Sequence, residues 1–130
     1  MATYTLSIAA LGFVAALLLV QLLVADVLGV LKKHTPGTPV EADHSNVLFR
    51  ATRTVGNANE SIAIFICALL FCFFSSADPG NMALAAWVYA TARTLYAVCY
   101  YANLQLLRSL TFAVSLMALA ALIMIGALSG

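Results

Sequence analysis

The sequence predicts an all-α fold: an integral membrane four-helix bundle with up-and-down topology. First, 64% of the 130 residues are hydrophobic and only 8% are charged, whereas a soluble domain carries about a quarter charged residues. Second, the mean hydropathy is +1.02, and the apolar residues form four stretches long enough for spans of about 20 residues. Third, proline, glycine and polar residues gather between these stretches. A soluble protein and a nucleic-acid-binding protein are therefore excluded.

The four apolar stretches make up a single transmembrane domain over residues 1–130. The expected helices cover about residues 6–31, 47–75, 82–101 and 107–128. No basic residue precedes the first apolar stretch, and the stretch exceeds the 7–15 residues of a signal-peptide core. The first helix is therefore expected to stay in the mature protein.

The connections between the helices differ in length. Lys32–Asn46 contains two prolines and a glycine and is expected to be the one long loop. Ser75–Asn81 contains Asp-Pro-Gly and is expected to be a tight turn, so the second and third helices form an antiparallel hairpin. The third connection lies within Tyr101–Ser109, which has neither proline nor glycine.

Basic residues flank only the first and third connections. The positive-inside rule then places these connections in the cytoplasm and both termini outside. The basic residues concerned are Lys32, Lys33, Arg50, Arg53 and Arg108.

Polar residues follow one face of the second expected helix. Arg50, Arg53, Asn57 and Glu60 are spaced 3, 4 and 3 residues apart. At about 100° per residue, all four lie within a sector of roughly 80° and form a stripe about 15 Å long. This polar stripe offers cations, an amide and a carboxylate, which suit a small zwitterionic or anionic ligand arriving from the cytoplasmic side.

The third expected helix repeats this pattern with Arg93, Tyr96 and Tyr100, spaced 3 and 4 residues apart. Charged residues at membrane depth face a bundle interior or a wet cavity, and Glu60 and Arg93 are the deepest candidates. The alternative to a ligand site is a buried Glu60–Arg93 ion pair, with the helix-two arginines reaching lipid headgroups.

Other polar and aromatic residues have simpler interpretations. Asp26 is expected to pair with a helix-two arginine or to be hydrated rather than to act in catalysis. Trp87, Tyr89 and Tyr101 are expected to anchor helix ends at the membrane interface. No metal site is expected, because the three cysteines, Cys67, Cys72 and Cys99, lie in apolar helices without histidines at ligand spacing.

The stripe resembles the helix-two pattern Arg-x-x-Arg-x-x-x-Asn-x-x-Glu of the membrane-associated proteins in eicosanoid and glutathione metabolism, called MAPEG. The segments "ARTLYAVCYY" (residues 92–101) and "RSLTF" (residues 108–112) resemble a second shared element. The resemblance covers essentially the whole chain. Within the family, the chain resembles the bacterial members that are similar to microsomal glutathione transferases.

This resemblance implies a homotrimer that binds glutathione, as cosubstrate, between subunits near the cytoplasmic face. Arg53 and Asn57 would hold the peptide and its carboxylates, and Glu60 the γ-glutamyl ammonium group. Tyr96 and Tyr100 would come from helix three of a neighbouring subunit. The remaining glutathione-binding candidates are Lys32, Arg50 and Arg93.

Arg108 resembles the arginine that stabilises the glutathione thiolate, and it is the expected catalytic residue. A fixed cation lowers the pKa of a thiol from about 8.5 and so makes it a better nucleophile at neutral pH. The implied enzyme is a glutathione transferase, with possible peroxidase activity on lipophilic electrophiles or hydroperoxides. The alternative is a non-catalytic membrane binding or scaffold protein; a transporter is disfavoured because the stripe occupies one end of the membrane only.

Overall fold

The computed structural model describes residues 2–130, which are all-helical and contain no β-strand. A short 3₁₀ helix, η1 (Ala2–Tyr4), leads into four long helices. These are α1 (Thr5–Leu31), α2 (Val47–Phe74), α3 (Pro79–Tyr101) and α4 (Gln105–Ser129). Each is long and apolar enough to cross a membrane. The predicted all-α, four-helix membrane fold is therefore confirmed.

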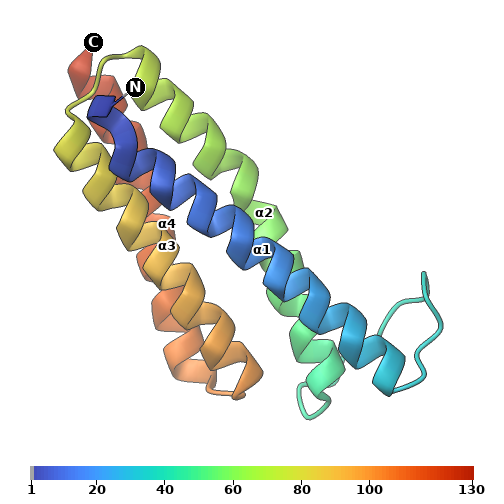
Figure 1. Cartoon of the computed structure of the whole chain (residues 1–130). Coiled ribbons are helices and arrows are strands. Elements are labelled where there is room, and N and C mark those ends of the chain that lie inside the picture. The colour runs from blue at the N-terminus through green and yellow to red at the C-terminus, as the bar shows by residue number, and fades with distance from the viewer. Residues whose placement is uncertain (1) are drawn as a thin grey trace.

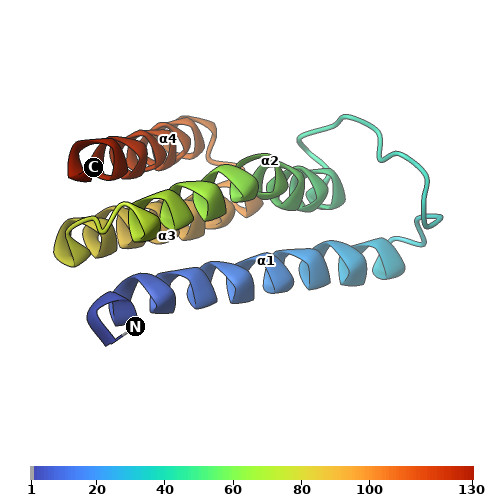
Figure 2. The ribbon, with the colours of Figure 1, turned by 90° about the horizontal axis from the view of Figure 1, so that it is seen from above.

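The helices alternate in direction along an elongated bundle (Figure 1). Helix α1 packs against α2 and α3, and α4 packs against the same two helices from the other side. Figure 2 shows α2 and α3 between the outer helices. Within residues 2–130, α1 and α4 do not pack against each other.

The bundle interior is built around aromatic and small side chains. Phe65 of α2 stacks on Tyr89 of α3 with ring centroids 4.3 Å apart, and both side chains are buried. The Tyr89 hydroxyl shares a 2.8 Å hydrogen bond with Ser61 Oγ, which satisfies both buried groups. The expectation that Tyr89 anchors a helix end at the interface is therefore wrong, since Tyr89 belongs to the core.

Helix α3 begins at Pro79, three residues before the predicted start at Met82. Asp78 is its N-cap, and the carboxylate accepts a 2.8 Å hydrogen bond from the amide of Asn81. Proline suits the first turn of a helix because its missing amide proton has no partner there. The Asp-Pro-Gly sequence therefore starts a helix here as well as ending a turn, and the predicted turn over Ser75–Asn81 is too long.

The third connection is reduced to Ala102–Leu104, between α3 and α4. Asn103 adopts a left-handed conformation with φ 60°, which asparagine tolerates better than most residues. The amide of Leu104 donates to the carbonyl of Cys99 at 2.8 Å and closes the end of α3. This tight connection holds the start of α4 beside the end of α3, where the polar residues gather.

The outer faces of the helices expose mainly apolar side chains, as expected of surfaces that meet lipid. Asp26 of α1 is exposed and forms no ion pair with an arginine of α2 in the described part of the chain. The expected pairing of Asp26 with a helix-two arginine is therefore not found within residues 2–130, and its hydration stays a prediction.

Candidate functional site

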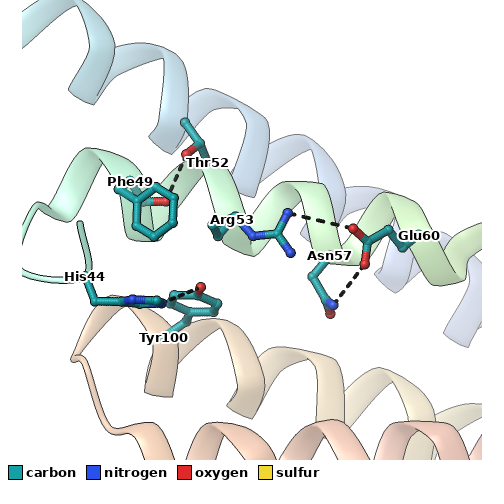
Figure 3. A network of polar contacts seen from close by, with 7 residues as sticks. All are labelled: His44, Phe49, Thr52, Arg53, Asn57, Glu60 and Tyr100. Atoms are coloured by element: carbon teal, nitrogen blue, oxygen red, sulfur yellow. Dashed lines mark hydrogen bonds and ion pairs between the residues drawn. The ribbon is translucent and has the colours of Figure 1, made fainter. Parts of the chain in front are cut away.

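Three members of the polar stripe on α2 interact with one another (Figure 3). Arg53 Nη1 lies 3.7 Å from Glu60 Oε1, and Asn57 Nδ2 donates to Glu60 Oε2 at 3.3 Å. The Arg53 and Glu60 side chains remain 44% and 61% exposed. Glu60 lies about 20 Å along α2 from Val47, by the helical rise, so this charge lies well inside the span.

Arg50, the fourth member of the stripe, has a different set of contacts. Its Nη1 donates to the carbonyl of His44 at 2.7 Å, and its Nε donates to the carbonyl of Tyr101 at 3.3 Å. Arg50 thereby ties the end of the first loop to the end of α3. Its guanidinium is used for local structure, and it does not line the pocket described next.

A polar pocket of about 230 Å³ lies where α2, the end of α3 and the start of α4 meet. Its walls combine two guanidinium groups, an amide, two phenols and a hydroxyl. The lining residues are Arg53, Asn57, Tyr96, Tyr100, Arg108, Ser109 and Phe112. Five of the residues proposed from the sequence thus meet in one pocket.

Tyr100 connects the pocket to the first loop. On one side, Arg108 Cζ lies 4.5 Å from the centre of the Tyr100 ring, within the range of a cation–π contact. On the other side, Tyr100 Oη lies 3.2 Å from His44 Nε2, and the two rings stack with centroids 5.9 Å apart (Figure 3). These contacts hold both Tyr100 and the Arg108 cation in place.

His44 is a residue that the sequence analysis did not propose for the site. It is placed by Phe49, whose ring centroid is 5.0 Å away, and by the Arg50 contact to its carbonyl. Next to it, the hydroxyl and amide of Ser45 donate to Asp43 and keep the pKa of this carboxyl below its usual value. No sequence pattern links His44 to Tyr100, 56 residues away.

Arg93 does not line the pocket with Tyr96 and Tyr100. Its side chain is only 2% exposed, and its Cζ lies 4.2 Å from the centre of the Tyr96 ring. Glu60 pairs with Arg53, so the alternative of a buried Glu60–Arg93 ion pair is wrong. Long side chains on a helix lean toward its N-terminus, and for Arg93 this direction leads away from Arg108.

Two further expectations concern the surroundings of the pocket. Lys32 is exposed at the C-terminal end of α1 and is not a lining residue. Tyr96 and Tyr100 come from the same chain as Arg53 and Asn57, whereas the resemblance implied the α3 of a neighbour. One chain alone therefore brings these four groups together.

The chemistry of the pocket favours an anionic ligand. The guanidinium groups of Arg53 and Arg108 can each donate several hydrogen bonds to a carboxylate, and Asn57 can donate or accept. A negative charge that forms beside Arg108 is stabilised by a cation that the Tyr100 ring already holds in place.

The model of a family described as the MAPEG family matches residues 1–128, which is nearly the whole chain. No curated protein matches the sequence.

Proposed function

The chain belongs to the MAPEG family, and on that premise we propose that it is a membrane enzyme that binds glutathione and activates its thiol. The thiol would attack a lipophilic electrophile, as in a transferase, or a lipophilic hydroperoxide, as in a peroxidase. Family membership supports glutathione-related or eicosanoid-related chemistry in a membrane, and the pocket supports the more specific proposal.

The observation that carries the proposal is the meeting of Arg53, Asn57 and Arg108 in one pocket of about 230 Å³. Glutathione has two carboxylates, an ammonium group and a thiol, so it needs cations, an acid and a group that stabilises sulfur. Arg53 and Asn57 are assigned to the peptide and its carboxylates. Glu60, held beside them at 3.7 Å and 3.3 Å, is assigned to the ammonium group.

Arg108 is assigned to the thiolate. Its guanidinium is fixed over the ring of Tyr100, so it need not be ordered when the ligand arrives. A cation beside the sulfur lowers the thiol pKa from about 8.5 and raises the thiolate fraction at neutral pH. In a transferase, the sulfur then forms a C–S bond with the electrophilic carbon, and the leaving group departs with the electron pair of its broken bond. In a peroxidase, the sulfur attacks the terminal oxygen of the hydroperoxide, the O–O bond breaks and the alcohol leaves; a second glutathione then reacts with the sulfenic acid to give glutathione disulfide and water.

The exposed charges of the stripe support a homotrimer with sites at its subunit interfaces. Arg53 and Glu60 are partly exposed inside a membrane span, where contact with lipid is unfavourable by about 2.5–3.5 kcal/mol per charge. A second copy of the chain would cover this face and could bring Lys32 toward the ligand. The basic residues at the first and third connections support an orientation in which the pocket faces the cytoplasm and both termini face outward.

Glutathione binding and thiolate absorbance in mild detergent test the proposal. Wild type should bind glutathione and show a thiolate signal, and Arg108→Ala should lose at least about tenfold of that signal, because a hydrogen bond to a charged group contributes about 1.5–3 kcal/mol. Gln105→Ala is the matched control, since Gln105 shares the first turn of α4 but does not line the pocket.

Binding without a thiolate signal in wild type would indicate a non-catalytic glutathione-binding protein. Absence of binding would contradict the whole proposal.

A further inference from the structure

A second, much smaller cavity lies one layer deeper, between α1, α2 and α3. Its volume is about 10 Å³, and most of its wall is apolar, including Leu17 and Ile62. Two long polar side chains also line it: Gln21 of α1 and Arg93 of α3. This cavity is separate from the polar pocket, with which it shares no lining residue.

Gln21 and Arg93 are both fully buried and have unused hydrogen-bonding groups. The side chains are 1% and 2% exposed. Neither the amide nitrogen and oxygen of Gln21 nor the three guanidinium nitrogens of Arg93 have a hydrogen-bond partner within residues 2–130. Buried polar groups, and buried charges above all, are normally hydrogen-bonded because leaving them without partners is costly.

The size of the cavity limits what could satisfy these groups. A volume of about 10–15 Å³ is the space that one water molecule needs, and such a water makes about three hydrogen bonds to buried polar groups. A water can accept from the guanidinium of Arg93 and donate to the amide oxygen of Gln21. A carboxylate or phosphate group is too large for the same space.

We infer that Gln21 and Arg93 hold one internal water molecule, and that Gln21 thereby acts as a positioning residue for the polar pocket. The second half of this inference rests on the proposed function. Arg93 is then no direct ligand of glutathione. It acts through the ring of Tyr96, which its cation faces.

The contacts that lead from this water to the pocket are short. Arg93 Cζ lies 4.2 Å from the centre of the Tyr96 ring. Tyr96 lines the polar pocket and meets the Tyr100 ring edge-on, with centroids 5.6 Å apart. A guanidinium held by Gln21 and water keeps its place over Tyr96, whereas an unbound one can turn away. Helix α1, which contributes nothing to the pocket wall, would thus influence the pocket through Gln21.

The water can be tested without glutathione by NMR on the full chain in detergent with ¹⁵N-labelled glutamine and arginine. The chain has two glutamines, Gln21 and Gln105, so Gln21→Leu assigns their side-chain signals. The Gln21 amide should show a cross-peak to a long-lived water, and the Arg93 Nε proton should exchange faster with solvent in Gln21→Leu. Absence of the water cross-peak would overturn the water site.

A double-mutant cycle of melting temperatures is a second test of the coupling between Gln21 and Arg93. Removing one partner leaves a buried polar group unsatisfied, whereas replacing both with apolar groups of similar shape is close to neutral. Gln21→Leu should therefore lower the melting temperature more than Gln21→Leu combined with Arg93→Leu. If the effects of the two substitutions simply add, Gln21 and Arg93 are not coupled and the inference is wrong.

The thiolate signal of bound glutathione tests the positioning role of Gln21. Gln21→Leu should reduce the thiolate signal about tenfold, in line with the loss of one hydrogen bond to a charged group. Gln21→Glu, which keeps an oxygen that can accept from the water and adds a charge that attracts the Arg93 guanidinium, should restore most of the signal. Leu17→Met, a volume-conserving change in the same cavity, is the control. If wild type binds glutathione and Gln21→Leu is unaffected, the positioning role is wrong; if wild type does not bind, only the proposed function fails.

Discussion

Glu60 has two contacts that tie it to the pocket, one to Arg53 and one to Asn57. Glu60→Gln keeps the shape of the side chain and an oxygen that can accept from Asn57, but it removes the negative charge. The variant keeps the contact with Asn57 and removes a charge that is unfavourable at membrane depth, so the chain should still fold. Glutathione affinity should fall about tenfold, because a charge-assisted contact to the ammonium group is lost.

Calorimetric titration of the purified protein measures this change. Glu41→Gln, an exposed acid in the first loop, is the control. An unchanged affinity in Glu60→Gln would remove Glu60 from the proposed binding site.

His44 orients Tyr100 through the hydroxyl of the tyrosine and through ring stacking. His44→Phe keeps an aromatic ring but removes the hydrogen bond, which contributes about 0.5–1.5 kcal/mol. The rate of conjugation with a lipophilic electrophile should therefore fall about two- to tenfold. His34→Phe is the control, because within residues 2–130 the hydrogen bonds of the His34 side chain go to Thr38 in the same loop and not to the pocket. Equal rates in the two variants would show that His44 has no role in the site.

At the scale of single residues, helical spacing predicted which residues share a face of a helix. It did not predict which groups each side chain contacts. The spacing of Arg53, Asn57 and Glu60 was enough to bring them together, because residues three and four apart are neighbours on a helix. Arg50 follows the same spacing, but its position at the end of α2 let it bond the carbonyls of His44 and Tyr101. Such contacts depend on how a loop closes, which the sequence does not reveal.

Helices α2 and α4 approach closely at Gly126. A Cβ added to Gly126 would lie 2.6 Å from Phe71 Cδ1 and 2.8 Å from Cε1, so Gly126→Ala requires the ring to move. Overpacking of this kind costs typically about 1–3 kcal/mol. The melting temperature in detergent should therefore fall for Gly126→Ala and recover in Gly126→Ala combined with Phe71→Leu.

Gly12 provides the matched control, since it also lies within a helix but has nothing within 4 Å of an added Cβ. Gly12→Ala should be neutral or stabilising by up to about 1 kcal/mol, because alanine favours helix. A similar loss of stability in both variants would show that the contact with Phe71 is unimportant.

At the scale of helices, hydropathy predicted the four spans because lipid requires long apolar segments. The start of α3 was misplaced because Asp-Pro-Gly is compatible with a turn and also with an N-cap followed by proline at the first helical position. The burial of Tyr89 was missed because an aromatic residue with one polar atom suits an interface and a satisfied core position equally well. Only the partner, Ser61, distinguishes the two, and it comes from another helix.

The whole molecule presents a charged face on α2 among otherwise apolar surfaces, which favours association of several copies. The resemblance to the family implies that the number of copies is three. Native mass spectrometry from mild detergent should show three copies of the 13.7 kDa chain. Arg53→Leu combined with Glu60→Leu should abolish glutathione binding and weaken the trimer, because it removes the ligand-facing charges and with them the unfavourable contact with lipid that favours association. The wild-type chain in sodium dodecyl sulfate is the dissociated control. A monomer that binds glutathione at full affinity would contradict the trimeric site.

The antiparallel order of α2, α3 and α4 followed from the two short connections between them, which leave adjacent helices no other arrangement. The rotation of each helix about its own axis could not be predicted from the sequence. The polar and apolar faces of the four helices differ too little to select one rotation. Arg93 shows the consequence: the same spacing that brought Tyr96 into the pocket took Arg93 into the α1 side of the bundle.

The pocket draws its walls from α2, α3 and α4 but not from α1. During biosynthesis these helices leave the ribosome in that order, and Arg108 lies in the first turn of the last one. A nascent chain that has inserted three helices therefore holds the residues assigned to the carboxylates without the cation assigned to sulfur. Thiol activation would begin only when synthesis of the chain is nearly complete, and a product truncated before α4 would be inert rather than partly reactive.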